Sequence, residues 1–291
     1  MTETSSPTVW RRWLAFELVR LRRENGLEQK DVAKALRCTK AKVSYIETAE
    51  RPVVLRDLEE VLLPLYGVPE ERWPTYLEAA SNSRRKGWWE SYGSETLPDW
   101  FSLFVGLEQG ASRIRTYEAQ LVPGLLQTSD YANALLRRST MERSEHELET
   151  SARFRLSRQS VFGRENPPRL WAILDEAVLR RLVGSRETMR FQLERLANAT
   201  RDPKITIQVV PFTTGAHPGM TGPFTMLGFP WEHDPGVVFL EYRSGALYLE
   251  EAHAIESHTV AFEHLCALAL PPDESISMIR TIAKEFSDDE H

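Results

Sequence analysis

The stretch LVRLRRENGLEQKDVAKALRCTKAKVSYIETAE, residues 18–50, decides the fold of the amino-terminal part of this chain. Apolar residues at helical spacing predict a helix over residues 10–24, which ends at Gly26. A second, short helix is expected over residues 29–36, and Thr39 can cap a third. The pattern therefore predicts three closely spaced helices joined by short turns.

Two more helices complete the predicted amino-terminal domain. After a turn at residues 50–52, the apolar pattern fits a fourth helix over residues 55–66 and a fifth over residues 70–80. We therefore expect an all-α domain of five helices over residues 11–80, preceded by a flexible polar tail at residues 1–10.

The third helix has the composition of a helix that enters a DNA groove. Val43 and Ile46 face the core. The residues expected to face outward are Lys40, Ala41, Lys42, Ser44 and Tyr45. A major groove about 12 Å wide admits such a helix when its outward residues are long or polar. Gln29, at the start of the preceding helix, can reach a phosphate. The pattern is that of a helix-turn-helix module.

The distribution of charge supports the same interpretation. The whole chain has a formal net charge of −6, which alone argues against binding to nucleic acid. Residues 1–86, however, hold 16 Lys and Arg against 13 Asp and Glu, and residues 11–42 hold 10 against 4. A basic module on an acidic chain indicates one part that faces phosphates and another that does not. On charge alone, a solvated, arginine-rich helix face remains the alternative.

Residues 18–50 resemble the XRE-type, lambda-repressor-like helix-turn-helix family of transcriptional regulators. The matching residues are Leu21, Gly26, Leu27, Gln29, Val32, Ala33, Leu36, Val43, Ser44, Ile46 and Glu47. On the helix that begins after Thr39, the resemblance implies base contacts from Lys40, Ala41, Ser44 and Tyr45. It implies phosphate contacts from Gln29, Lys42 and Arg51. It also implies a structural ion pair between Arg22 and Glu47.

Two turns depart from the family pattern. Arg37 and Cys38 replace the glycine-containing turn that usually precedes the recognition helix, and Ala49 and Glu50 replace the glycine usual after Glu47. Because such turns use a residue with positive φ, we expect backbone strain or a changed turn at these places. A helical bundle that only dimerises or docks a protein stays open as the alternative.

Length and composition exclude several classes of protein. The 291 residues leave room for two domains, and 42% apolar with 27% charged residues indicate a folded chain. No apolar run reaches the roughly 20 residues of a membrane helix, and the amino terminus lacks the order of a secretory signal. Cys38 and Cys266 alone form neither a disulfide scaffold nor a four-cysteine zinc site. We expect a reducing cytoplasm as the location, with no membrane partner.

The carboxy-terminal part is predicted to be a separate, mixed domain. Residues 81–100 are polar, basic and rich in turn formers, and we interpret them as a linker whose Trp88 and Trp89 dock on a neighbouring surface. Residues 101–291 form the larger domain. Its expected strands cover residues 169–174, 205–210, 223–228 and 237–242. Its expected helices cover residues 129–138, 145–161, 177–183, 187–199, 257–268 and 275–286. The fold class is α+β: a five-helix lambda-repressor-like domain followed by a larger mixed α/β regulatory domain.

Segments of this larger domain resemble an uncharacterised domain found behind XRE modules in actinobacterial regulators. The matching segments are residues 87–89, 107–135, 158–159, 174–184, 191–196, 207–227 and 237–242. The run PGLLQT at residues 123–128 is the most distinctive of them. The resemblance implies an actinobacterial regulator, often paired with a small partner protein, and it implies little chemistry for the domain.

The larger domain offers scattered candidates for catalysis. The charged ones are Glu108, Glu118, Arg113, Arg115, Asp175, Glu176 and Glu241. Asp175 and Glu176 lie between a strand and a helix, where the helix dipole favours acidic residues anyway. Glu241 is expected to face solvent. For His217, in a loop rich in glycine, we favour a surface turn over closure on a ligand.

The sequence lacks the signatures of common catalytic sites. It has no HExxH, no Cys/His cluster, no phosphate-binding glycine loop and no GxSxG elbow, so we expect no metal, no cofactor and no enzyme. We expect a sequence-specific regulator that binds double-stranded DNA as a homodimer, with a second domain that dimerises and senses a small-molecule effector or a partner. Two alternatives stay open: an antitoxin-like module acting with a small partner protein, and a nucleotide-using enzyme for ADP-ribosyl transfer.

Overall fold

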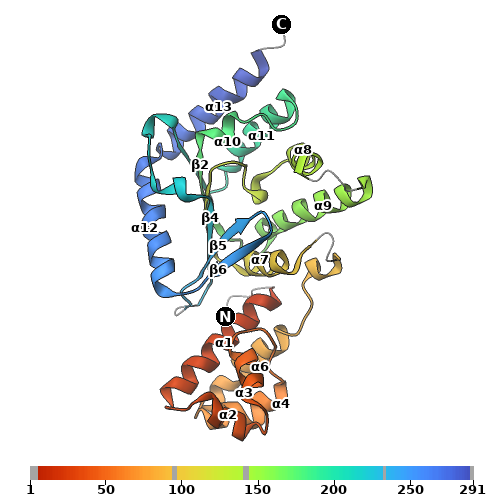
Figure 1. Cartoon of the computed structure of the whole chain (residues 1–291), viewed down its shortest axis with the longest axis vertical. Helices are drawn as coiled ribbons and strands as arrows, with labels where there is room; N and C mark the ends of the chain where they lie inside the picture. Colours follow the sequence, from red (N-terminus) through yellow and green to blue (C-terminus); the bar gives the residue numbers. More distant parts are fainter. Residues whose placement is uncertain (1–5, 94–96, 140–143, 232–233, 289–291) are drawn as a thin grey trace. The chain divides into compact units, whose positions relative to one another are not determined.

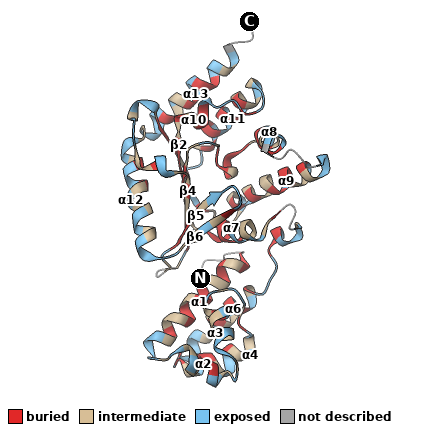
Figure 2. Cartoon of the chain, viewed as in Figure 1, coloured by how far each residue is buried: buried red, intermediate tan, exposed pale blue. Residues whose placement is uncertain are grey.

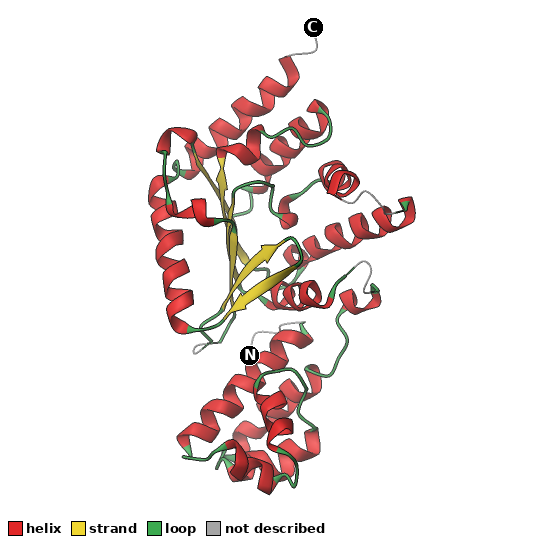
Figure 3. Cartoon of the chain, in the orientation of Figure 1, coloured by secondary structure: helices red, strands yellow, loops and turns green. Residues whose placement is uncertain are grey.

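The computed structural model describes residues 6–93, 97–139, 144–231 and 234–288 of the chain. The chain divides into two compact units, namely Met1–Ser91 with Phe229–Asp234, and Tyr92–Gly228 with Pro235–His291. Within the described residues the first unit contains helices and loops only, and every strand belongs to the second (Figure 3). A helical unit and a mixed unit give the α+β organisation that the sequence predicts.

The first unit is built from short helices (Figure 1). They are α1 (Pro7–Glu24), α2 (Gln29–Ala35), α3 (Lys40–Glu47), α4 (Leu55–Asp57), α5 (Leu63–Leu65) and α6 (Trp73–Asn82). A π-helical turn at Leu58–Leu62 joins α4 to α5, so the predicted fourth helix is present with this distortion. A 3-10 turn at Glu70–Arg72 begins the predicted fifth helix, and Pro74 lies in the first turn of α6, where proline is tolerated.

Apolar side chains from these helices meet in one core. Leu18 of α1, Val43 of α3 and Tyr76 of α6 are each at most 2% exposed. Figure 2 shows the helices of this unit with buried inner sides and exposed outer sides. Full burial of one such side chain contributes roughly 1.5–3 kcal/mol to folding. The shared core therefore fixes α2 and α3 against α1.

The prediction of a flexible tail over residues 1–10 is wrong from residue 7 onward. α1 begins at Pro7, and Val9 and Trp10 are 0% and 3% exposed. Proline suits the first helical position because its φ is preset and no hydrogen bond is needed from its nitrogen there. Residues 1–5 lie outside the described part of the chain.

The predicted linker, residues 81–100, is wrong in its bounds. α6 continues to Asn82, and a 3-10 helix covers Trp88–Ser91, where Trp89 is only 3% exposed. The division between the two units falls directly after this 3-10 helix. Burial of a large aromatic ring orders a segment whose polar composition alone is typical of a loop. Residues 94–96 lie outside the description.

The second unit contains one six-stranded sheet. Its strands are β1 (Arg113–Glu118), β2 (Arg169–Asp175), β3 (Ile205–Val210), β4 (Phe224–Gly228), β5 (Val237–Tyr242) and β6 (Gly245–Leu249). They follow the order β3-β2-β1-β4-β5-β6, with β1, β2 and β3 parallel and the other pairings antiparallel. All four predicted strands are present. The sequence predicts neither β1, in which charged residues interrupt the apolar ones, nor β6.

Helices cover both faces of this sheet (Figure 1). They are α7 (Asp99–Gly110), α8 (Ser129–Ser139), α9 (Glu145–Ser157), α10 (Glu176–Arg180), α11 (Arg186–Ala199), α12 (Ala252–Leu268) and α13 (Pro272–Asp288). α12 covers one face, with Phe262 packed in a cluster with Tyr117 and Ile173. Because side chains alternate along a strand, Thr116 and Glu118 of β1 face the opposite side, where α7 and α9 lie.

One segment distant in sequence completes the first unit. Phe229–Asp234 follows β4 in the chain, and its Trp231 packs on Trp13 with ring centroids 6.0 Å apart. Asp234 accepts two hydrogen bonds from Arg12, at 3.1 and 3.2 Å. The prediction that all residues after 101 belong to the second domain is therefore wrong for this segment, because sequence spacing cannot reveal such a long-range contact.

Candidate DNA-binding surface

Caps at both helix starts set the turn between α2 and α3. Thr39 is the N-cap of α3, and its hydroxyl accepts a hydrogen bond from the backbone N–H of Lys42 at 3.2 Å. α2 begins with a capping box, in which the backbone N–H of Glu28 donates to the Asp31 carboxylate at 2.9 Å. The predicted starts of both helices, at Gln29 and after Thr39, are confirmed.

The two turns that lack a glycine are strained. Arg37, before α3, has a φ of 49°, and Ala49, after it, has a φ of 59°. Both values lie in the left-handed region, which costs a residue with a Cβ about 1–2 kcal/mol. The strain expected from the departures at these turns is therefore present at both positions.

α3 presents its polar residues outward. Val43 and Ile46 are 2% and 6% exposed and lie in the core. On the opposite side, the exposed residues are Lys40, Ala41 and Tyr45, and the half-buried ones are Lys42 and Ser44. The predicted inner and outer faces of the helix are both present.

Arg22 and Glu47 form the predicted ion pair beneath this helix. Arg22 donates to the two carboxylate oxygens at 2.6 and 2.8 Å, and the two side chains are 12% and 6% exposed. The hydrogen bond to Glu47 raises the pKa of Arg22. Arg22 also donates to the carbonyl of Leu27 at 3.0 Å, and Gln29 donates to Glu47 at 2.9 Å. These contacts tie α1, α2 and α3 together.

Two side chains expected to contact phosphate are engaged within the unit. One N–H of the Gln29 amide is used by Glu47, which leaves the second for another acceptor. The amine of Lys42 lies 2.7 Å from a carboxylate oxygen of Asp57. A phosphate at Lys42 would have to share that amine with Asp57.

Lys40, Tyr45 and Arg51 are better placed. Lys40 is exposed, and no carboxylate among the described residues lies within 4.0 Å of its amine. Tyr45 is 39% exposed, and the guanidinium of Arg51 lies 5.1 Å from the centroid of its ring. The backbone N–H of Arg51 donates to the carbonyl of Tyr45 at 3.0 Å. A tyrosine and an arginine held side by side can contact a base edge and an adjacent phosphate.

Five of the ten basic side chains in residues 11–42 form ion pairs with acidic side chains in the described part of the chain. The paired ones are Arg12, Arg20, Arg22, Lys30 and Lys42. Around α3, the exposed cations with no such partner within the described ranges are Lys34, Arg37, Lys40 and Arg51. Lys34 and Arg37 are not among the contacts predicted from the sequence, and their only sequence signal is their position at the end of α2 and in the turn before α3.

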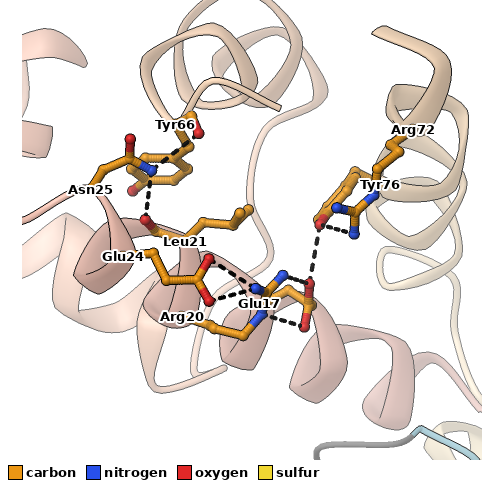
Figure 4. Close-up of polar contacts among 8 residues, drawn as sticks. All are labelled: Glu17, Arg20, Leu21, Glu24, Asn25, Tyr66, Arg72 and Tyr76. Carbon is orange, nitrogen blue, oxygen red and sulfur yellow. Dashed lines mark hydrogen bonds and ion pairs between the residues drawn. The ribbon is translucent and has the colours of Figure 1, made fainter. Parts of the chain in front are cut away.

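A second polar network fixes α1 against α6 (Figure 4). The Tyr76 hydroxyl donates to Glu17 at 3.0 Å, and Arg20 donates to the same carboxylate at 2.7 and 3.1 Å. Arg20 also donates to Glu24 at 2.7 Å. Although burial opposes ionisation, the hydrogen bond from Arg20 lowers the pKa of Glu17. Glu17 thus acts as a buried structural acceptor between two helices.

Several catalytic candidates of the second unit lie between α7, α9 and the sheet. Glu108 is 2% exposed and accepts hydrogen bonds of 2.9 and 2.6 Å from Arg158. Glu118 and Glu241 both line a cavity. Glu241 is exposed, as expected, but it borders this cavity at the end of β5. No local sequence pattern indicates the cavity.

Asp175, Glu176 and His217 meet beside the end of β2. Asp175 caps α10 by accepting a hydrogen bond from the backbone N–H of Ala177 at 2.8 Å. Glu176 accepts one from the backbone N–H of Phe212 at 2.8 Å. The Nε2 atom of His217 lies 3.5 Å from a carboxylate oxygen of Asp175, and the His217 side chain is 7% exposed. The predicted surface turn is therefore wrong for this side chain, since the loop folds its imidazole inward.

The remaining candidates, Arg113 and Arg115, lie on β1 and outside the cavity wall. Arg113 is exposed. The guanidinium of Arg115 lies 5.7 Å from the ring centroid of Phe262 on α12, at cation–π distance. The contact with Phe262 indicates a structural role for Arg115.

The described residues contain neither a metal-binding cluster nor a membrane-spanning helix. Among the described residues, no group of three or more His, Cys, Asp and Glu side chains is placed to hold a metal ion. In the same part of the chain, no helix combines the length and the apolar character needed to cross a membrane.

Comparison with known families gives two matches. A helix-turn-helix domain matches residues 13–73, which contain α2 and α3. A domain of unknown function (DUF5753) matches residues 101–281, more than half of the chain. Neither a curated protein nor a solved structure matches. The resemblance to a helix-turn-helix regulator with an uncharacterised second domain is thereby confirmed.

Proposed function

The chain belongs to the family with the domain of unknown function DUF5753 and carries a helix-turn-helix domain ahead of it, and from this premise we propose that it regulates transcription by sequence-specific binding to double-stranded DNA. The observation that carries the proposal is the outer face of α3. This helix is capped at Thr39, supported by the Arg22–Glu47 pair, and presents Lys40 and Tyr45 to solvent.

In this proposal α3 enters the major groove. An α-helix with its side chains is about 10–12 Å across, which fits a major groove about 12 Å wide. Lys40, Ser44 and Tyr45 contact base edges, since a lysine amine can donate to the acceptors of guanine and a hydroxyl can donate or accept. Arg37 and Arg51, at the two ends of the helix, contact the phosphates on either side.

We further propose an XRE-type, lambda-repressor-like mode of binding by a homodimer. One short recognition helix reads only a few base pairs, so affinity and specificity require two copies on half-sites about one helical turn apart. We assign dimerisation and the sensing of a small-molecule effector or partner to the second unit. For that unit we propose binding rather than catalysis, because a sensor needs only different affinities in two states.

The experiment that tests the proposal compares two lysines. Lys40→Ala should weaken binding to a selected DNA site about tenfold, within the roughly 1–3 kcal/mol of one base contact. Lys284→Ala, an exposed lysine on α13, is the matched control and should bind like the wild type. Affinities are measured by fluorescence anisotropy at about 150 mM salt, since weaker salt inflates non-specific binding. Equal losses in both variants would contradict a DNA contact through α3.

A further inference from the structure

The second unit contains a cavity of about 640 Å³ between the sheet and helices α7 and α9. It lies on the face of the sheet opposite α12, where Thr116 and Glu118 of β1 alternate with the buried Tyr117. Cavities of about 300–1,000 Å³ are the usual size for small organic ligands. The cavity is therefore large enough for a molecule of drug size.

One wall of the cavity is aromatic. Phe104 of α7 stacks on Phe239 of β5 with ring centroids 4.1 Å apart, and Phe101 stacks on Phe104 at 5.5 Å. Trp100 and Phe154 also line the wall. Planar apolar side chains gathered on one side favour a ligand with a flat aromatic body, which gains by stacking as well as by leaving water.

Two glutamate side chains that line the cavity form no ion pair within the described residues. Glu118, at the end of β1, and Glu241, near the end of β5, both line it. In the part of the chain that the structure describes, no lysine or arginine nitrogen lies within 4.0 Å of either carboxylate. The hydrogen bond that Glu118 accepts is a long one of 3.4 Å from the Thr116 hydroxyl. Burial, helped by the nearby charge of Glu241 and opposed by that of Arg158, raises the pKa of Glu118 to about 8. Glu118 is therefore mostly protonated at neutral pH in the free protein, and an ammonium group would displace that proton.

A guanidinium with no carboxylate partner faces the same cavity. Arg155 of α9 donates one hydrogen bond, to the amide oxygen of Gln127 at 3.1 Å. Within the described ranges, no carboxylate oxygen lies within 4.0 Å of it. Its neighbour Arg158 is different, because Glu108 already neutralises it. Burial, together with the charge of Arg158, lowers the pKa of Arg155 to about 10, although the charge of Glu241 beyond ion-pair distance opposes this shift. A guanidinium has five donors, so most of those of Arg155 remain for an anion.

We propose that this cavity binds a zwitterionic aromatic small molecule, in which an ammonium group meets Glu118 and Glu241, a carboxylate meets Arg155, and an aromatic body stacks on the phenylalanine wall. The chemical class is that of aromatic amino acids and their derivatives. A purely anionic ligand leaves the Glu241 carboxylate facing it, and a purely cationic ligand leaves the Arg155 guanidinium facing it. Only a ligand with both charges satisfies both groups.

The inference deepens the sensing role proposed for the second unit, and it rests on that role only for its regulatory consequence. The ligand site itself does not require DNA binding. A failure of α3 to bind DNA would leave ligand affinity unchanged, and a failure of ligand binding would leave the affinity of the free protein for DNA unchanged. The two failures are therefore distinguishable.

Three fluorescent probes of equal length test the proposal on the full chain. Dansyl-lysine, labelled on its side-chain amine, carries an ammonium and a carboxylate at its free end. Dansylcadaverine carries the ammonium alone, and dansyl-aminocaproic acid carries the carboxylate alone. Their affinities are measured by the rise in dansyl fluorescence on titration with the protein. We expect dansyl-lysine to bind about tenfold tighter than either of the other two, since each charged hydrogen bond contributes a factor of that order.

Two variants then assign the charges. Glu118→Gln should remove the preference for dansyl-lysine over dansyl-aminocaproic acid but keep its preference over dansylcadaverine. Arg155→Gln should do the reverse. Glu194→Gln, on the exposed surface of α11, is the control and should keep both preferences. A variant that failed to fold would lose all three probes, whereas each cavity variant is expected to keep one preference.

The outcome in the wild-type protein decides the proposal even without the variants. Binding of either singly charged probe as tightly as dansyl-lysine, or no binding of any probe, overturns it. Unchanged preferences in both cavity variants overturn the assignment of the charges to Glu118 and Arg155.

Discussion

Within the described residues, each of the two units holds a buried arginine–glutamate pair that joins segments distant in sequence. Arg22 and Glu47 are 25 residues apart and join α1 to α3. Glu108 and Arg158 are 50 residues apart and join α7 to the turn after α9. Both pairs are bidentate, with bonds between 2.6 and 2.9 Å. They differ in their surroundings, since the first supports an exposed helix and the second borders a cavity.

The difference shows what kind of contact a sequence reveals. The first pair lies in a compact segment whose glycine, apolar residues and caps carry the family resemblance, and that resemblance implies the pairing of Arg22 with Glu47. The second pair depends on where the sheet places α7 and α9, and no local pattern records that. A buried ion pair can thus be predicted from the sequence when both partners lie in one recognisable segment. A pair of the same geometry between distant segments cannot.

The largest effect is expected from breaking the pair in the second unit. Glu108→Ala leaves the charge of Arg158 uncompensated between the rings of Phe101 and Phe104. The expected loss in the free energy of unfolding is about 3–5 kcal/mol, measured by urea denaturation of the full chain. Glu194→Ala, which removes an exposed ion pair with Arg190, is the control and should cost less than about 1 kcal/mol. A similar small cost for both variants would contradict the structural importance of the Glu108–Arg158 pair.

Breaking the pair in the first unit should lower both the free energy of unfolding and the affinity for DNA. Glu47→Ala removes the acceptor of both Arg22 and Gln29, and it should lower the free energy of unfolding by about 2–4 kcal/mol. DNA affinity should fall as well, because α3 loses its support from α1 and α2. Denaturation and anisotropy on the same preparation check both effects. Unchanged DNA affinity in a destabilised but folded variant would show that the pair does not position α3.

The Glu118 side chain, which has no cation within ion-pair distance in the described ranges, predicts a pH dependence of stability. The pKa of Glu118 is about 8 in the folded state, raised by burial and by Glu241, with Thr116 and Arg158 opposing. The folded state therefore holds this proton more tightly than the unfolded state does, and the free energy of unfolding should fall as pH rises from about 5 to about 8. Glu118→Gln should abolish this component. A difference between wild type and variant that does not change with pH would contradict the raised pKa.

The smallest effect is expected at the strained turn after α3. Ala49→Gly relieves a φ of 59° and should increase the free energy of unfolding by about 0.5–1 kcal/mol, after the entropy cost of glycine. Ala41→Gly, within α3, is the control with the opposite sign and should cost about 1 kcal/mol. Thermal unfolding of the three proteins measures the order. If both variants are destabilised alike, the turn is not strained.

Most of the first unit could be predicted from the sequence because its signals are local. The cap at Thr39, the start of α2 at Gln29 and the inner face of α3 follow from spacing within about 30 residues, and the partner of Arg22 is what the family resemblance implies. The engagement of Lys42 by Asp57 could not be predicted, since both a phosphate and a carboxylate suit a lysine amine. Nor could the contribution of Trp231, which reaches the core of the first unit from a distant part of the chain.

In the second unit, strands rich in β-branched residues were predictable and the cavity was not. β2, β3 and β5 are apolar runs bounded by turn formers. β1 alternates charged and apolar residues, so Glu118 gave no sign that it faces a cavity rather than solvent. The cavity exists only because strands and helices far apart in sequence meet around it.

The most direct test of the central claim, that α3 reads DNA sequence, is selection of bound fragments from a genomic library at about 150 mM salt, with the wild-type protein and with Tyr45→Ala. We predict that the wild type enriches a shared inverted repeat and that the variant loses the preference at one position of each half-site. The expected discrimination at that position is roughly 1–3 kcal/mol. The same enriched sites with the same preferences for both proteins, or no enrichment by the wild type, would contradict base reading by α3.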